Sequence, residues 1–249
     1  MYREILFTTK DAGEFISGVI LFDETIRQKT RDGRSFVEVL EQQGIVPGIK
    51  VDKGAKAMAN FPGEKITEGL DGLRERLTEY RKLGARFAKW RAVITIGDGI
   101  PTRTCIDSNA EALARYAALC QEGDLVPIVE PEVDIHCPEK ARAEALLKAA
   151  ILQELDALPP GDLVMLKLTL PEEDNLYAEC VAHPKVVRVV ALSGGYTRAE
   201  ANARLRRNHG IVASFSRALV EGLSAGQSDA EYNALLDASI ESIFQASNT

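Results

Sequence analysis

The sequence of 249 residues predicts an α/β fold, a (β/α)8 barrel of which seven strands can be recognised. Three observations predict it. Short apolar runs alternate with segments of helical spacing, which indicates a parallel sheet buried on both faces. In several runs an apolar residue comes earlier and a charged one later on the same face, as in barrels. No GxGxxG motif follows the first run, so nothing favours an open, doubly wound sheet over a barrel.

The seven predicted strands are bounded by polar residues, glycine or proline. In chain order they span Gly18–Phe22, Val46–Val51, Ala85–Trp90, Val126–Pro131, Leu163–Leu168, Val186–Leu192 and Ile211–Phe215. Apolar residues at helical spacing predict two of the helices, one with Leu70, Leu73, Leu77 and Tyr80 and one with Leu146, Leu147, Ala150 and Leu155. A Ser or Thr followed three residues later by Glu predicts the start of three helices, at Ser108, Thr197 and Ser228.

Composition limits the class of protein. The chain is long enough to bury one substantial core, and we expect a single domain over residues 1–249. The net charge of −7, without any Lys/Arg-rich run, argues against binding to nucleic acid or to an anionic membrane. No apolar run approaches the length of a membrane span, and the first residues do not form a signal-peptide core. We therefore expect a soluble, cytoplasmic protein.

The cysteines do not indicate a disulfide framework or a metal site. Cys105, Cys120, Cys137 and Cys180 are widely spaced and form no CxxC pair, so reduced thiols are expected. His136 stands beside Cys137, but one such pair without further ligands at zinc spacing is a weak signal. We expect no metal and no cofactor.

Lys167 lies inside the apolar run from Leu163 to Leu170. Burying an ammonium group in an apolar strand is costly, and proteins usually respond by lowering the pKa of the lysine until the neutral amine is populated. Because a neutral amine is a nucleophile, Lys167 is a candidate for a Schiff base with a ketone or aldehyde. The alternative is a strand-end lysine whose ammonium reaches solvent.

Charged residues of other strands share this late placement. Side chains alternate along a strand, so Lys89 and Arg91 lie on one face of their strand, and Glu130 and Glu132 on one face of theirs. Lys50 fits the same placement in the second strand. Barrels carry their chemistry at the carboxyl ends of the strands. The alternative is a structural network in which these lysine and glutamate side chains pair with one another and take no part in catalysis.

A candidate phosphate site follows the last two strands. Ser193, Gly194 and Gly195 come after the sixth predicted strand and before the helix that begins at Thr197, so backbone N–H groups can approach an anion there. Arg217 follows the seventh strand and offers a bidentate guanidinium. Barrels commonly place a phosphate at these loops.

Seven stretches carry a family resemblance from about Gly18 to the C-terminus. They are GVILFDETIRQK, GIKVDKG, FAKWR, VPIVEPEV, VMLKLTLPEEDNLY, VVRVVALSGGY and ASFSRAL. In this order they resemble class I fructose-bisphosphate aldolases, the metal-free, Schiff-base type with a TIM-barrel fold. The second half is most similar to the short bacterial branch, and FAKWR is nearer the animal enzymes.

The resemblance implies a role for each matching residue. Lys167 resembles the lysine that forms the iminium with the ketose, with Glu130 as the main general acid/base. Lys89 resembles the cation that disfavours the ammonium form of Lys167. Glu132 resembles an assistant to Glu130 or an orienter of Lys89, and a purely structural ion pair is the alternative.

The remaining matches concern the two phosphates of the substrate. Ser193, Gly194, Gly195 and Arg217 resemble the residues that hold one phosphoryl group. Lys50 and Arg91 resemble those that hold the second.

The resemblance implies a glycolytic and gluconeogenic enzyme. It would reversibly cleave fructose 1,6-bisphosphate into dihydroxyacetone phosphate and glyceraldehyde 3-phosphate, with a phosphosugar as its ligand and a homo-oligomer as its assembly. Two alternatives stay open. One is another Schiff-base lyase, acting on deoxyribose phosphate or a tagatose bisphosphate. The other is a truncated homologue without activity.

Two departures from the family pattern are expected to matter. Members carry, before the part matched here, a first barrel strand ending in an aspartate, whereas Met1–Leu6 looks like the helix after that strand. About one βα unit, roughly 30 residues, is expected to be absent, which makes the domain N-terminally truncated. At the other end the chain lacks the terminal tyrosine of animal enzymes, so proton exchange at the enamine must use another residue.

Overall fold

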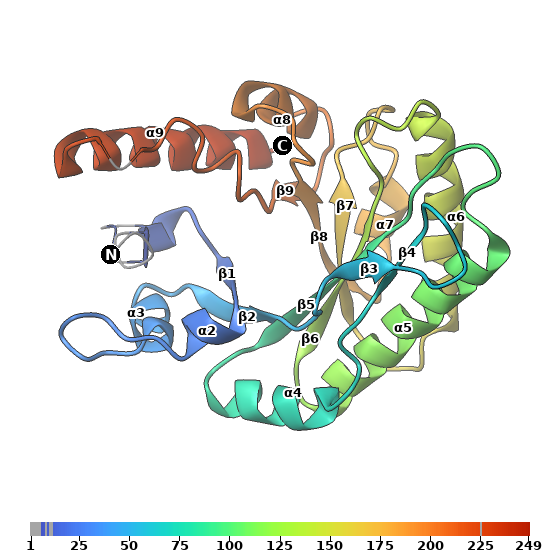
Figure 1. The fold of residues 1–249 in the computed structure, drawn as a ribbon. Helices are drawn as coiled ribbons and strands as arrows, with labels where there is room; N and C mark the ends of the chain where they lie inside the picture. Colours follow the sequence, from blue (N-terminus) through green and yellow to red (C-terminus); the bar gives the residue numbers. More distant parts are fainter. Residues whose placement is uncertain (1–5, 8, 10–11, 225) are drawn as a thin grey trace. The chain divides into compact units, whose positions relative to one another are not determined.

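The computed structural model describes residues 6–7, 9, 12–224 and 226–249 (Figure 1). The expected helix at Met1–Leu6 lies outside the described residues except for Leu6. The strands are β1 (Gly18–Leu21), β2 (Val46–Lys50), β3 (Ala55–Ala57), β4 (Lys65–Thr67), β5 (Phe87–Val93), β6 (Val126–Glu132), β7 (Val164–Thr169), β8 (Val186–Leu192) and β9 (Ile211–Ala213). The helices are the 3-10 helix η1 (Ala12–Glu14) and α2 (Asp23–Ile26), α3 (Phe36–Gln42), α4 (Leu73–Lys82), α5 (Arg103–Glu122), α6 (Lys140–Ala157), α7 (Ala178–Ala182), α8 (Arg198–Leu205) and α9 (Asp229–Ser247).

The seven predicted strands all form, and they belong to one sheet. Its order is β1-β2-β5-β6-β7-β8-β9, so the strands follow one another in the order of the chain. The pairs β1/β2, β2/β5, β7/β8 and β8/β9 are parallel. Sequential parallel strands joined through helices are the arrangement of a (β/α)8 barrel. Because the described residues supply seven strands to this sheet, the fold is an incomplete barrel, as expected from the sequence.

The chain forms two compact units. The first contains the residues up to Ala92 together with Arg103–Val129, and the second contains Val93–Thr102 and Glu130–Thr249. The boundary near residue 130 falls inside β6. The expectation of one domain over residues 1–249 stays a prediction.

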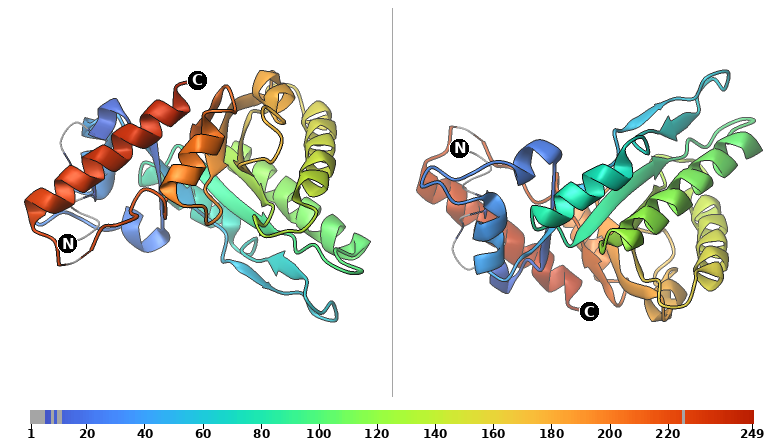
Figure 2. Two further views of the ribbon diagram at one scale, coloured as in Figure 1. Left: turned by 90° about the horizontal axis from the view of Figure 1, so that it is seen from above. Right: turned by 90° about the horizontal axis from the view of Figure 1, so that it is seen from below.

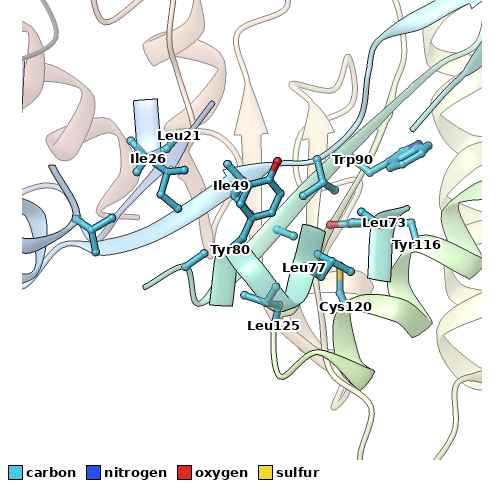
Figure 3. Close-up of a cluster of buried hydrophobic side chains, with 14 of the residues drawn as sticks. Leu21, Ile26, Ile49, Leu73, Leu77, Tyr80, Trp90, Tyr116, Cys120 and Leu125 are labelled. Atoms are coloured by element: carbon cyan, nitrogen blue, oxygen red, sulfur yellow. The ribbon is translucent and has the colours of Figure 1, made fainter. Parts of the chain in front are cut away.

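The core of the first unit is a cluster of buried side chains from β1, β2 and β5 and from helices α3, α4 and α5. Figure 3 shows its centre, with Trp90 near Tyr116 and Leu77 near Cys120. The rings of Trp90 and Tyr116 have centroids 5.5 Å apart, and the Tyr116 hydroxyl donates to the carbonyl of Ile128 at 3.2 Å. The last part of β6 in this unit is therefore fixed by α5.

Gly48 of β2 makes room for an aromatic ring of the neighbouring strand. Gly48 is paired in register with Phe87 of β5. A Cβ at position 48 would lie only 2.1 Å from Cε2 of the Phe87 ring. The ring therefore occupies the space that a side chain at position 48 would need.

In the second unit, β7 and β8 carry the core. Leu166 and Leu168 of β7 and Val189 and Ala191 of β8 are buried. Helices α8 and α9 lie beside each other (Figure 2), joined by hydrogen bonds from Arg198 Nη1 to Ser239 Oγ at 2.7 Å and from Asn202 Nδ2 to Ser242 Oγ at 3.3 Å.

The antiparallel hairpin of β3 and β4 was not expected from the sequence. Its strands have three residues each and no continuous apolar run, so neither length nor period identifies them. Long-range contacts hold it in place beside α5 in the first unit (Figure 2), where Asn109 Nδ2 donates to the carbonyl of Lys65 at 2.9 Å. The Thr67 hydroxyl donates to the carbonyl of Arg91 at 2.7 Å.

One of the three predicted helix starts is wrong. Ser108 lies inside α5, which begins at Arg103. The buried face of the helix already starts with Cys105 and continues through Asn109, and an ion pair at 2.7 Å joins Arg103 and Asp107 in its first turns. The burial of Cys105 and the ion pair of Arg103 with Asp107 therefore stabilise helical residues before Ser108, and they outweigh the preference of this serine for the N-cap position.

The other two starts are confirmed. Thr197 accepts a hydrogen bond from the N–H of Glu200, and Ser228 forms a full capping box with Glu231. Ser35 and Glu38 form a further capping box at the start of α3 that the sequence reading missed. Among the described helices, none is both long enough and apolar enough to cross a lipid bilayer. The four cysteines are free thiols.

Candidate functional site

The predicted site residues fall into two groups, one in each compact unit. The group in the first unit lies on β2 and β5 and consists of Lys50, Lys89 and Arg91. The group in the second unit lies on β6 and β7 and after β8 and β9, and consists of Glu130, Glu132, Lys167, Ser193, Gly194, Gly195 and Arg217. Lys50 and Glu132 end their strands as the barrel pattern predicts, whereas Lys89 and Lys167 lie in the middle of strands that continue further than expected.

Lys167 and Glu130 form the centre of the second group. The Nζ atom of Lys167 lies 3.2 Å from Oε1 of Glu130, and the two side chains are 13% and 4% exposed. Leu166 and Leu168, the neighbours of the lysine in β7, are buried on the opposite face of the strand. The amine is thus held beside a carboxylate, and little of the side chain reaches solvent. This geometry allows proton exchange between the two groups.

A buried threonine fixes the strand ends next to this pair. The Thr169 hydroxyl donates to the carbonyl of Val133 at 2.8 Å and accepts from the N–H of Val133 at 3.1 Å. Thr169 stands two residues after Lys167, and Val133 directly follows Glu132. The two hydrogen bonds therefore hold the end of β7 against the end of β6 at the level of the site.

Glu132 is only half-buried, whereas Glu130 is buried, although both lie on the same face of β6. The inner carboxylate therefore lies beside the amine, and the outer one lies nearer solvent.

The glycine loop after β8 approaches the arginine after β9. Gly194 and Gly195 have φ values of 63° and 126°, and a Cβ on Gly194 would lie 2.5 Å from Cγ2 of Ile135. A Cβ on Gly195 would be 3.9 Å from the guanidinium nitrogens of Arg217. Ser193, at the start of the loop, is buried, whereas Arg217 is exposed. Backbone amides, a hydroxyl and a guanidinium are therefore available together, which suits a phosphoryl group.

In the first unit, Lys50 and Lys89 meet at a residue that the sequence reading did not single out, Asp52. Lys50 Nζ is 2.6 Å from Oδ1 of Asp52, and Lys89 Nζ is 3.4 Å from Oδ2. The N–H of Arg91 also donates to Oδ2, at 3.3 Å, while the Arg91 side chain is exposed. The structure thus brings the predicted residues of this unit together around one carboxylate.

The pKa of Asp52 follows from this position. Burial would raise the pKa of the carboxyl group, but the ammonium groups of Lys89 and Lys50 and the Arg91 N–H outweigh burial. The pKa therefore lies below its ordinary value of 3.8, and the carboxylate is ionised at neutral pH.

A signal for Asp52 was present in the sequence. Asp52 follows Lys50 by two residues, so if the strand continued past Lys50, its alternation would place Asp52 on the same face as Lys50. This signal is weak, because β2 ends at Lys50 and the alternation of a strand is not expected beyond its end.

Within the part of the chain that the structure describes, no three His, Cys, Asp or Glu side chains are grouped so that they could hold a metal ion.

Comparisons with known proteins agree on one family. A family model described as fructose-bisphosphate aldolase class-I matches residues 1–155. The chain is 48% identical over 250 residues to fructose-bisphosphate aldolase class 1 of Synechocystis sp., covering 100% of this chain and 81% of that protein. It is 45% identical over 223 residues to "Fructose-bisphosphate aldolase 5, cytosolic" of Arabidopsis thaliana, covering 82% of this chain and 62% of that one.

A solved structure extends the similarity to three dimensions. Fructose-bisphosphate aldolase of Plasmodium falciparum, in a ternary complex with TRAP and a small-molecule inhibitor, matches with a TM-score of 0.87 at 36% identity. The match covers 99% of this chain and 81% of that one.

Proposed function

The chain belongs to the class I fructose-bisphosphate aldolase family, and from this premise we propose how its residues carry out the reaction of the family. The reaction is the reversible cleavage of fructose 1,6-bisphosphate into dihydroxyacetone phosphate and glyceraldehyde 3-phosphate through a lysine Schiff base, a step of glycolysis and gluconeogenesis. The observation that carries the proposal is the amine of Lys167, on a side chain only 13% exposed, at 3.2 Å from the Glu130 carboxylate.

Lys167 is the proposed nucleophile. Its uncharged Nζ attacks the ketone carbon of the sugar, and the carbinolamine loses water to give a protonated imine. Glu130 donates the proton that leaves with the hydroxyl group, for which its position beside Nζ is suited. The iminium then accepts the electron pair of the bond between carbons three and four as the 4-hydroxyl gives its proton to Glu130, now a carboxylate. Glyceraldehyde 3-phosphate leaves, and protonation and hydrolysis of the enamine release dihydroxyacetone phosphate.

Lys89 and Glu132 are proposed as assisting groups. We assign Lys89 a cationic role on the resemblance of the FAKWR stretch, and the Asp52 carboxylate at 3.4 Å from its Nζ supports this assignment. Glu132 is proposed to relay protons to Glu130 or to orient Lys89. A structural ion pair is the alternative for Glu132.

The two phosphates of the substrate are proposed to bind to different residues. Ser193, the amides of Gly194 and Gly195 and the guanidinium of Arg217 would hold one, since the loop and the arginine lie close together. Lys50 and Arg91 would hold the other, as the family resemblance implies.

We also propose a homo-oligomer and a cytoplasmic location. The location is supported by the relative from Arabidopsis thaliana that is described as cytosolic. Native mass spectrometry of the purified chain measures the assembly, and a monomer at micromolar concentration would contradict the first of these two proposals.

Reductive trapping tests the proposed nucleophile. The protein is treated with sodium borohydride in the presence of dihydroxyacetone phosphate, and peptide mass spectrometry locates the reduced adduct. We expect the adduct on Lys167, and we expect Lys167→Met to lose both the adduct and cleavage activity, a loss on the order of 10³-fold or more, because the covalent route is gone. Lys185→Met, which removes a lysine that donates to the Asp156 and Leu158 carbonyls, is the matched control and should keep both.

Other outcomes have distinct meanings. An adduct on Lys89 would overturn the assignment of the nucleophile. An adduct on Lys167 without cleavage of fructose 1,6-bisphosphate would favour the inert homologue. Cleavage of a tagatose bisphosphate or of deoxyribose phosphate in preference to fructose 1,6-bisphosphate would favour another Schiff-base lyase.

A further inference from the structure

Two cations of the proposed site depend on one buried carboxylate. Asp52 stands between Lys50 and Lys89 with its side chain 2% exposed. Neither the proposed mechanism nor the proposed phosphate contacts assign a role to this aspartate. Its surroundings define one.

Each oxygen of Asp52 has one lysine and one backbone amide as partners. Oδ1 accepts from Lys50 Nζ at 2.6 Å and from the N–H of Gly54 at 3.1 Å. Oδ2 accepts from Lys89 Nζ at 3.4 Å and from the N–H of Arg91 at 3.3 Å. The two amides fix the carboxylate to the backbone on both sides, so it cannot follow the movement of either lysine.

The lysines need such an anchor. A lysine side chain has four rotatable bonds, and its ammonium group has a defined position only when a partner holds it. Lys50 is held twice by Asp52, because its Nζ also donates to the backbone carbonyl of Asp52 at 2.7 Å. Two ammonium groups that approach the same point also repel each other, and the shared carboxylate offsets that repulsion.

We propose that Asp52 is a positioning residue that holds the ammonium groups of Lys50 and Lys89 at a fixed spacing, one for the second phosphate of the substrate and one for the imine chemistry. The inference rests on the proposed function, which supplies the roles of the two lysines. Asp52 itself touches no reacting atom in this scheme.

Asparagine is the informative substitution. It keeps the shape of the side chain and replaces one acceptor oxygen by an NH₂ donor. In either orientation that donor faces an ammonium group and a backbone N–H, so one lysine loses its hydrogen bond to the side chain. Both lysines lose the negative charge that offsets the repulsion between them, so both are displaced.

Steady-state kinetics with two substrates test the proposal. In this proposal the second phosphate, assigned to Lys50, is the one on carbon six, which fructose 1-phosphate lacks. For Asp52→Asn we expect the KM for fructose 1,6-bisphosphate to rise about fivefold to tenfold and that for fructose 1-phosphate to change less than about twofold, since only the bisphosphate uses Lys50. We expect kcat to fall with both substrates, because Lys89 is displaced as well.

A double-mutant cycle separates positioning from general weakening of the fold. In a Lys50→Met background, Asp52→Asn should no longer raise the KM for the bisphosphate, because the lysine that it would misplace is absent. Glu144→Gln is the matched control. Glu144 is also a buried carboxylate, with Oε1 at 2.6 Å from Lys140 Nζ, and it belongs to neither group of site residues. Glu144→Gln should lower the free energy of unfolding, but it should not raise the KM for the bisphosphate more than the KM for fructose 1-phosphate.

Three results would overturn the proposal. The first is a KM for the bisphosphate within about twofold of the unsubstituted protein in Asp52→Asn. The second is an equal rise in KM with and without Lys50. The third is a rise in KM in Glu144→Gln that is likewise larger for the bisphosphate than for fructose 1-phosphate. If Asp52→Asn does not fold, Asp52→Glu keeps the charge but displaces it by one methylene, and the same rise in KM is expected there.

Failure of the proposed function gives a different pattern. In that case the unsubstituted protein forms no adduct on Lys167 and cleaves neither substrate. Isothermal titration calorimetry then compares the affinities of Asp52→Asn and of the unsubstituted protein for the two phosphosugars, and this measurement needs no turnover. Weaker binding of the bisphosphate alone in Asp52→Asn supports the positioning role, and unchanged binding of both sugars contradicts it.

Discussion

At the scale of single residues, the titration of Asp52 links the candidate site to stability. Its folded-state pKa is lowered below 3.8, since the two lysines and a backbone amide outweigh the effect of burial. The carboxylate therefore adds stability above its unfolded-state pKa, and this contribution is lost as the pH falls through the folded-state pKa.

Denaturation of Asp52→Asn should show this dependence. We expect the variant to be less stable than the unsubstituted protein by an amount that is constant from about pH 7 to about pH 5 and narrows below the ordinary aspartate pKa. Urea unfolding followed by circular dichroism measures the difference. Asp107→Asn, which breaks an exposed pair with Arg103, should show little difference at any pH. If the difference in the free energy of unfolding between Asp52→Asn and the unsubstituted protein grew as the pH was lowered, the lowered pKa of Asp52 would be contradicted.

Thr169→Val tests the reciprocal bonds at the end of β7. The substitution keeps the shape but leaves the buried N–H and carbonyl of Val133 without the hydroxyl that pairs with both. We expect a loss of about 1–3 kcal/mol in the free energy of unfolding, measured by urea denaturation. Thr78→Val, at an exposed position where the hydroxyl bonds only to its own helix, should change it by less than about 0.5 kcal/mol. Equal losses in the two variants would show that the bonds to Val133 add nothing.

Residue-scale reasoning from the sequence singled out Lys167 as a lysine inside an apolar run, and Glu130 because alternation along a strand places late charged residues on one face. It missed Asp52 and Thr169 because neither stands out by type. An aspartate after a strand and a threonine within one are ordinary, and only the three-dimensional partners show what they hold.

At the scale of elements, the helix starts were only partly predictable. The capping pattern fits Ser228 and fails at Ser108, although both have Glu three residues later. The capping pattern reflects a local preference of the backbone. In α5 the burial of Cys105 and Asn109 stabilises the helix before Ser108, so the helix begins at Arg103. The β3/β4 hairpin was missed for a related reason, since its strands are defined by contacts with distant residues.

Two alanine substitutions distinguish a true cap from an apparent one. Ser228→Ala removes the hydroxyl that accepts from Glu231 at the start of α9 and should cost about 1 kcal/mol, or a decrease in Tm of about 2–4 °C. Ser108→Ala lies inside α5 and should leave Tm unchanged or slightly raised, because alanine is the better helix former. Thermal unfolding measures both. A decrease at Ser108 as large as that at Ser228 would mean that α5 starts later than described.

At the scale of the whole molecule, the strand order was predictable and the division into compact units was not. Seven apolar runs separated by helical patterns imply sequential parallel strands, and these form in the expected order. Boundaries are usually recognised in the sequence from flexible linkers rich in glycine, proline or polar residues. Here a boundary falls within β6, a regular strand of the sheet, so no flexible linker marks it.

The contact between Gly48 and Phe87 has a consequence for how this sheet can evolve. A methyl group at position 48 and a phenyl ring at position 87 compete for the same space. Substitution at one position is therefore tolerated only with a reduction at the other, and the two positions should covary across relatives. A sequence that acquires alanine at the first while retaining the ring at the second would have to separate β2 from β5 next to Lys50 and Lys89.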